Sequence, residues 1–393
     1  MNSTQQSGAV LPSKNNHAVP LTRLAMALTL AAMLSACALA PGQKMIMPPT
    51  LPETSTDSGD PATEVQIPIT TIDLKLIRQQ QAARMADVKT TNDLGLFAKP
   101  TPYKLGPGDV LQITVWDHPE LAAALGQPQP NAKPSDAAPG FVVDGDGNIE
   151  FPYVTKPIHA AGKSAEQVQR EIYADLSKVF VKPQITVRVA SFRSAQVYVD
   201  GEVRAPGAQS VNDIPMTLTE AVNRSGGFTP AADQSRVTII RNGTSYPINV
   251  ADMIARGKNP SEIMLQPGDM LHVESREDNT VYVMGEVNAP KAVQPTHNGR
   301  LTLGEALSQA GDMNPNSADA KSLYVIRQAT SDKPEIYHLD ARSPVSMLLA
   351  NQFDLQSKDV VYVDNSGLVR ASRVLNLLLP AINAGLTAAI ITK

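Results

Sequence analysis

The chain has 393 residues, of which 42% are hydrophobic and 18% charged, so it can bury a core, and wholesale disorder is excluded. Its net charge of −4 and its aromatic content of 4% argue against a protein that mainly binds nucleic acid, which needs a basic surface and stacking rings. A single cysteine excludes disulfide frameworks and cysteine-based zinc sites.

The N-terminus is typical of a targeting segment. A polar stretch with two basic residues precedes an apolar run at 24–34, which is too short to span a membrane. The run ends in LSAC at 34–37, which resembles a bacterial lipobox. That resemblance implies removal of a signal peptide, 1–36, and lipidation of Cys37, with palmitate among the acyl chains. Ala38, where an aspartate would retain a lipoprotein in the inner membrane, favours the outer membrane. An ordinary signal peptide with a chance cysteine is the alternative.

An N-terminal arm is predicted over 37–102. Residues 38–60 are rich in Pro, Thr, Ser and Gly, which indicates extended chain. Apolar and polar residues then alternate over 65–76, as in a strand or a short helix.

A first compact unit is predicted over 103–191. The stretch LGPGDVLQITV at 105–115 indicates a turn that leads into a strand, and 126–140 a low-complexity surface loop. Residues 141–151 predict a β-hairpin around an Asp-Gly turn. The unit ends with a strand at 185–189.

A helix is predicted over 164–179 within this unit. Val168, Ile172 and Leu176 recur every four residues, and Ser164 with Gln167 forms a capping box.

An internal repeat follows and determines the architecture. VYVDGEVRAP at 197–206 recurs as VYVMGEVNAP at 281–290, and the later motifs recur at similar offsets. These are TLTEAV at 217–222 with TLGEAL at 302–307, VTIIR at 237–241 with LYVIR at 323–327, and LQPGDMLHV at 265–273 with LQSKDVVYV at 355–363. Two β-rich domains are therefore predicted at 195–276 and 279–365, and the overall class is α+β.

The C-terminal segment, 366–393, is almost entirely apolar. A helix over 368–391 would extend about 36 Å, enough for a hydrocarbon core of about 30 Å. Its few polar side chains share one helical stripe: Ser372, Asn376, Asn383 and Thr387. A barrel of such helices would turn this stripe toward a wet lumen, with Arg370 and Arg373 at the entrance. A buried amphipathic helix that closes the second repeat is the alternative.

Motifs that could carry chemistry are explained better by structure. GKS at 162–164 lacks the glycine that a P-loop needs five residues earlier, so we expect Ser164 to cap the helix. Asp144 and Asn148 lie in a stretch that begins like a calcium loop but lacks its glycine and its closing glutamate. We expect a hairpin turn there, and a weak cation contact stays open.

Asp117, His118 and Glu120 follow a strand end, with neither a second acid pair nor a nucleophile nearby in sequence. We expect a structural or interface role for them. The sequence therefore predicts no enzyme, no cofactor and no metal site.

The ordered motifs resemble the Wza-type polysaccharide export outer-membrane lipoproteins. The resemblance rests on YKLGPGDVL at 103–111, VWDHPEL at 115–121, DGNI at 146–149 with Pro152 and Tyr153, and PQITV at 183–187, together with the two GEV motifs. It implies an export domain, two soluble-ligand-binding β-grasp (SLBB) domains and a C-terminal helix that forms a barrel with its copies.

The resemblance also implies partners and a location. The expected assembly is a ring of eight copies, which works with an inner-membrane polysaccharide copolymerase coupled to a tyrosine kinase. The chain would lie mostly in the periplasm, with its C-terminus at the cell surface, and would export capsular polysaccharide or exopolysaccharide. A periplasmic glycan-binding lipoprotein that forms no pore is the alternative.

Overall fold

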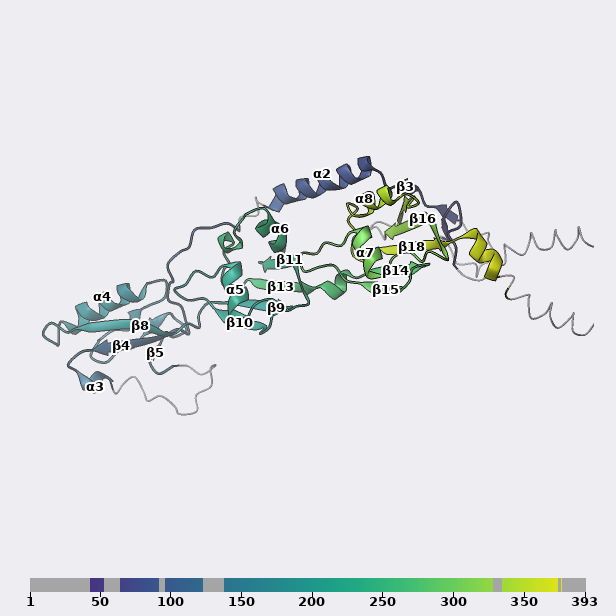
Figure 1. Ribbon diagram of the computed structural model, residues 1–393. Helices are drawn as coiled ribbons and strands as arrows, with labels where there is room; N and C mark the ends of the chain where they lie inside the picture. Colours follow the sequence, from purple (N-terminus) through teal and green to yellow (C-terminus); the bar gives the residue numbers. More distant parts are fainter. Residues whose placement is uncertain are drawn as a thin grey trace, which may run out of the picture.

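The computed structural model describes residues 43–52, 64–91, 96–122, 138–327, 334–373 and 376. Three β-rich units follow one another in an elongated row (Figure 1). We call them the leading unit (103–191), the first repeat (195–276) and the second repeat (279–365). The leading unit and the second repeat lie at opposite ends of the row. The mixed α and β content predicted from the sequence is confirmed.

The leading unit is a small antiparallel sheet, in the order β5-β4-β8, with a separate strand pair and two helices. Its elements are β4 (Val110–Val115), α3 (Pro119–Ala122), β5 (Phe141–Val142), β6 (Asn148–Ile149), β7 (Ile158–His159), α4 (Ala165–Leu176) and β8 (Ile185–Ser191). Helix α4 covers the sheet with three fully buried side chains, Val168, Ile172 and Leu176.

The start of α4 is the predicted capping box. The Gln167 backbone N–H donates to the Ser164 hydroxyl at 3.3 Å, and the Gln167 side-chain oxygen accepts from the Ser164 backbone N–H at 2.8 Å. The backbone N–H groups of Ser164 and Gln167, which lack the usual helical partner four residues earlier, are thus both hydrogen-bonded to side chains.

The hairpin predicted over 141–151 is wrong in its pairing. The turn exists, because the Gly147 N–H donates to the Asp144 carbonyl at 3.0 Å. However, β5 pairs with β4, whereas β6 pairs with β7. The Val143 N–H is bonded to the Asp109 carbonyl at 2.8 Å, which keeps the chain before the turn on the β4 side.

The two repeats share one sheet topology. The strand orders are β10-β9-β13-β11-β12 and β15-β14-β18-β16-β17, with one parallel pair near the middle of each. The first contains β9 (Gln196–Gly201), β10 (Gly207–Ser210), α5 (Leu218–Arg224), β11 (Ala232–Arg241), β12 (Thr244–Ile248), α6 (Val250–Ala255), η4 (Pro260–Glu262), β13 (Met270–Ser275) and η5 (Arg276–Asn279). The second contains β14 (Val281–Gly285), β15 (Lys291–Val293), α7 (Leu303–Gln309), β16 (Ala318–Arg327), β17 (Glu335–Leu339), η6 (Pro344–Ser346), α8 (Met347–Ala350) and β18 (Val360–Asn365).

The glycine of each GEV motif has a steric reason. Gly201 and Gly285 have φ of 83° and 89°, which disfavours other residues. A Cβ atom at either position would lie 2.1 Å from the carbonyl oxygen of Val273 or Val363 on the neighbouring strand. No side chain fits there, so both repeats retain glycine.

All three units contain the same turn, closed by a buried aspartate. Asp109, Asp269 and Asp359 are at most 2% exposed, and each accepts a hydrogen bond from the backbone N–H three residues earlier, at 2.7–3.0 Å. In the two repeats an arginine forms an ion pair with this aspartate: Arg241 with Asp269 at 2.7 Å, and Arg327 with Asp359 at 2.8 Å. The likeness of the closing turns to the opening LGPGD turn is therefore structural.

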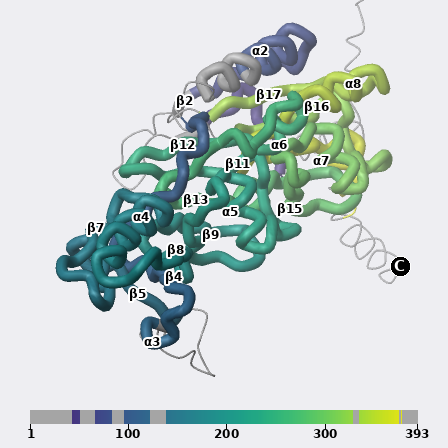
Figure 2. Tube along the Cα trace, turned by 90° about the vertical axis from the view of Figure 1, so that its left-hand side faces the viewer, coloured from purple at the N-terminus to yellow at the C-terminus, as the bar shows by residue number. Residues whose placement is uncertain are grey.

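The first part of the N-terminal arm packs against the second repeat, whereas Leu96 joins the core of the first repeat. The arm contains β1 (Thr50–Pro52), β2 (Glu64–Gln66), β3 (Ile69–Thr71) and α2 (Leu74–Thr91). Strand β3 joins the second repeat as a sixth strand, parallel to β17. Ile67 and Met45 pack with Tyr324, Ile336 and Tyr362 of the second repeat. Residues 65–76, for which a strand or a short helix was expected, form short strands and the beginning of α2. Helix α2 runs alongside the row toward the first repeat (Figures 1 and 2).

The chain is helical over 367–373 after β18. Within the described ranges, no helix combines the length and the apolar character needed to cross a bilayer. Most of the helix predicted over 368–391 lies outside the described residues, as does most of the surface loop predicted over 126–140.

Candidate functional site

The two ends of the described chain meet at the second repeat. The Tyr362 hydroxyl donates to the Gln43 backbone carbonyl at 2.7 Å, and the Asn365 side chain reaches the same oxygen at 3.4 Å. Burial, together with the nearby charges of Asp364 and Glu286, raises the pKa of Tyr362 to about 12, so its hydroxyl stays a donor. Cys37 lies outside the described residues, six positions before Gln43.

The base of the C-terminal helix is tied to the second repeat by an ion pair. Arg373 Nη2 lies 2.6 Å from Glu286 Oε1, and both side chains are partly buried. Burial alone would raise the pKa of Glu286. Hydrogen bonds from Ser317 and Arg373 and the Arg373 charge outweigh burial, so the pKa lies below its ordinary value. The carboxylate therefore stays charged near neutral pH.

The other residues predicted for the lumen are placed only in part. Ser372 and Asn376 are exposed, and the Ser372 hydroxyl donates to the Val369 carbonyl at 2.9 Å. Arg370 lies in the same helix, about one turn before Arg373, and its backbone N–H donates to the Ser366 carbonyl at 3.2 Å. Asn383 and Thr387 lie outside the described residues.

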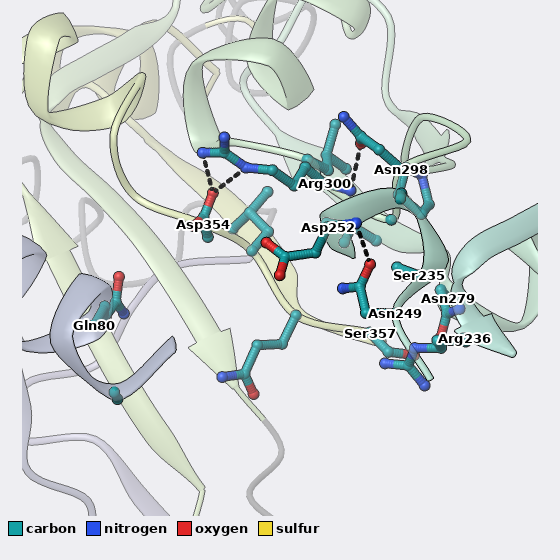
Figure 3. A pocket seen from close by; sticks show the side chains of 18 of the residues that line it. Gln80, Ser235, Arg236, Asn249, Asp252, Asn279, Asn298, Arg300, Asp354 and Ser357 are labelled. Carbon is teal, nitrogen blue, oxygen red and sulfur yellow. Dashed lines mark hydrogen bonds and ion pairs between the residues drawn. The ribbon is translucent and has the colours of Figure 1, made fainter. Parts of the chain in front are cut away.

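A polar cleft of about 900 Å³ lies between the two repeats, beside α2 (Figure 3). Arg300 and Asp354 form an ion pair at 3.0 Å on the wall from the second repeat. On the wall from the first repeat, Asn249 accepts from the Asp252 N–H at 2.7 Å. The Gln80 side-chain oxygen, contributed by α2, is buried and meets no donor among the described residues. Mixed donors and acceptors of this kind suit a hydroxylated ligand.

Sequence reasoning missed this cleft. Its lining comes from α2 and from several separate stretches of both repeats, so no single stretch of the sequence carries the pattern. The internal repeat was the available signal for a cleft, since it implied two adjacent domains. It did not give the angle between them, which determines whether a cleft forms.

The remaining chemical candidates have structural roles. His118 Nδ1 lies 2.9 Å from Glu120 Oε1 at an exposed position, and the His118 ring contacts the Phe180 ring at 4.3 Å. A backbone hydrogen bond and the His118 contact lower the pKa of Glu120, which disfavours it as a proton donor. Lys163 of the GKS stretch pairs with Glu171 at 2.6 Å.

The Asp144 turn also has a structural role. Asp144 Oδ1 accepts from the N–H groups of Asp146 and Asn148, at 2.9 and 2.8 Å. Across the described part of the chain, no group of three metal-ligating side chains comes together.

Comparison with known proteins gives matches along the chain. The family model for polysaccharide biosynthesis/export proteins matches residues 98–190, and the SLBB domain model matches 195–273 and 279–363. The chain is 43% identical over 381 residues to the EPS I polysaccharide export outer membrane protein EpsA of Ralstonia nicotianae, covering 95% of this chain and 98% of that one. It is 26% identical to the capsule polysaccharide export protein BexD of Haemophilus influenzae, covering 82% and 86% of the two chains. It is 25% identical to the capsule polysaccharide export outer membrane protein CtrA of Neisseria meningitidis, covering 72% and 77%.

Proposed function

This chain belongs to the polysaccharide biosynthesis/export family, and from that premise we propose that it exports capsular polysaccharide or exopolysaccharide across the outer membrane as a ring of identical copies. Members of this family are transport proteins and not enzymes. The full-length match to an export protein of the outer membrane supports the same location for this chain.

The meeting of both chain ends at the second repeat carries the structural part of the proposal. A lipid on Cys37 would be connected to Gln43 by six residues, which reach at most about 20 Å when extended. The C-terminal helix starts beside Gln43, because Tyr362 and Asn365 contact this residue just before the helix begins. Anchor and helix therefore leave the molecule at one end, as a protein held by both in one membrane requires.

In this arrangement the C-terminal helices of the ring form the pore. The stripe of Ser372, Asn376, Asn383 and Thr387 lines a wet lumen, since asparagine side chains are costly to expose to lipid. Arg370 and Arg373 lie at the periplasmic entrance, and Glu286 fixes the height of Arg373. The ring has eight copies, as the family resemblance implies.

The leading unit lies at the opposite end of the row from the second repeat (Figure 1). In the proposed arrangement it would extend into the periplasm. An inner-membrane polysaccharide copolymerase, coupled to a tyrosine kinase, would approach the protein from that side. Polymer would then enter at the leading unit and leave through the helical barrel.

Two measurements test this function. Deletion of the gene should abolish polysaccharide at the cell surface while the polymer accumulates inside, and unchanged surface polysaccharide would refute export. An epitope tag after Lys393 should be stained by antibody on intact cells. Staining only after permeabilisation would refute the spanning helix.

The polar cleft favours a second candidate function. A periplasmic lipoprotein that holds glycan between its repeats would need the cleft but not the C-terminal helix. The tag experiment separates the two, because such a protein keeps its C-terminus inside the outer membrane.

A further inference from the structure

The leading unit has an open pocket of about 530 Å³ to which the preceding sections assign no role. It is formed by the loop between β6 and β7, together with the beginning of β5. Phe151 is buried in the wall and its ring contacts the Phe141 ring in a tilted arrangement, with the centroids 4.8 Å apart. Tyr153 also lines the pocket, with 59% of its surface exposed.

Tyr153 is held in an unusual backbone conformation. Its φ is 64°, a region that bulky residues rarely occupy and that costs conformational energy. Two neighbouring loops share this feature, with Asp117 at φ 63° and Lys182 at φ 53°. Both flank the paired ends of β4 and β8, where Val115 faces Ile185. Three strained positions therefore occur in the loops at one end of the leading unit, as is common in binding sites.

Aromatic rings connect these loops. The Phe180 ring contacts the His118 ring at 4.3 Å and the Tyr153 ring at 5.4 Å in an edge-on arrangement. Phe180 therefore supports Tyr153 from one side, while Tyr153 keeps most of its own surface free. A strained, supported and exposed aromatic residue has no evident role in the core of the domain.

The pocket combines aromatic walls with a few polar groups. Glu150, Thr155 and Lys156 also line it, and all three are exposed. They supply one anion, one hydroxyl and one cation, so the pocket has no net charge. The size and the lining are those of small-ligand sites, in which apolar walls give affinity and a few polar groups fix orientation.

We infer that this pocket binds a sugar ring of the exported polysaccharide, with Tyr153 stacked on its C–H face. A pyranose has one face of C–H groups, which suits the electron-rich face of an aromatic ring, and a rim of hydroxyls, which suits Glu150, Thr155 and Lys156. The inference rests on the proposed export function. The site lies in the unit farthest from the second repeat, where the polymer would first meet the protein (Figure 1).

The substitution Tyr153→Gly tests the site without disturbing the fold. Glycine adopts positive φ readily, and this relief of backbone strain offsets the loss of the Phe180 contact, so we expect the unfolding temperature of the variant to change little. Oligosaccharides obtained by partial hydrolysis of the polysaccharide that the producing cells secrete are titrated into the full-length protein in detergent, and binding is followed by saturation-transfer NMR. Loss of the ring should weaken binding by about tenfold.

Matched variants serve as controls. Tyr153→Phe keeps the ring and should bind as the wild type does. Tyr173→Ala removes an exposed tyrosine from α4 of the same unit and should also leave binding unchanged.

Several results would overturn the inference. One is that the Tyr153→Gly variant binds the oligosaccharides as strongly as the wild-type protein does. Another is that the wild-type protein shows no saturation transfer to them. Loss of an inner-membrane partner from the Tyr153→Gly variant, with oligosaccharide binding intact, would make the pocket a protein-docking site instead. The gene-deletion test of export is independent of this binding test. If deletion abolishes surface polysaccharide but the pocket binds no oligosaccharide, the sugar site is refuted and the export function is not.

Discussion

Tyr362 and Gln43, at opposite ends of the chain, are joined by a hydrogen bond of 2.7 Å from the tyrosine hydroxyl to the backbone carbonyl. Tyr362 is only 7% exposed and packs in the cluster that includes Ile67 and Met45 of the arm. The arm is thus held by polar and apolar contacts together. Its attachment to the second repeat decides where a lipid anchor would place the molecule.

Replacement of Tyr362 by phenylalanine should loosen the arm. The apolar packing is kept and one hydrogen bond is lost, so we expect the second repeat to lose about 1 kcal/mol of stability. Limited proteolysis should cut faster near residues 43–50, while the export domain is unaffected. Tyr282→Phe, at an exposed position on β14, serves as the control and should change neither quantity.

The Asp359→Asn substitution should strongly destabilise the second repeat. Arg327 and Asp359 are 6% and 0% exposed, so removal of one charge leaves the other buried without a counter-charge. We expect a loss of about 3–5 kcal/mol in urea denaturation. Arg300→Met breaks a more exposed pair in the same domain and should cost about 0.5 kcal/mol. Equal effects of the two variants would contradict this account of burial.

The Glu286–Arg373 pair should make helix docking depend on pH. The folded pKa of Glu286 lies below its ordinary value of 4.5, so the pair contributes fully above that value and is lost as pH falls through the lowered pKa. The protection of the amides over 369–373 against hydrogen exchange, measured relative to the intrinsic exchange rate at the same pH, should therefore fall in acid. Glu286→Gln should show fast exchange already at neutral pH, with a loss of about 1 kcal/mol.

Glu202→Gln is the matched control for this pair. Glu202 holds the equivalent GEV position in the first repeat, where its carboxylate accepts from the Thr229 hydroxyl instead. Exchange over 369–373 should not change in this variant. A change there would mean that docking depends on the repeats in general and not on the Arg373 contact.

Lipidation at Cys37 is tested by Cys37→Ser. Because the chain has one cysteine, the variant should incorporate no radiolabelled palmitate and should no longer fractionate with the outer membrane. Continued labelling of the variant would place the lipid on another residue and refute the anchor.

Local sequence signals predicted local structure well. The predicted capping box of Ser164 with Gln167 forms because the signal lies within one helical turn, and the structure adds a second box, of Thr302 with Glu305. The Thr217 hydroxyl also caps its helix by accepting from the Glu220 N–H, and the offsets of 84–90 residues between the repeated motifs correspond to two sheets with one strand order. Signals of this kind depend on neighbours in the chain and can be recognised without knowledge of the whole fold.

Pairing between distant segments could not be predicted. The alternation in 141–151 suggested one hairpin, but Phe141 and Ile149 have different partners elsewhere in the unit. Nothing in the short stretch 69–71 indicates that it would pair with β17. The polar cleft and the Tyr153 pocket each depend on several loops meeting in space, and single residues in those loops carry no pattern.

The pairing of β3 with β17 imposes an order on folding. The N-terminal arm is synthesised first, but its partner strand is among the last parts of the chain to be made. The leading unit and the first repeat contain all the strands of their own sheets and can complete them earlier. The second repeat has to wait, and until then Ile67 and the strand edge beside it stay uncovered, a state that invites aggregation. In the lipid-anchored protein that we propose, a periplasmic chaperone that shields the arm would act in that interval.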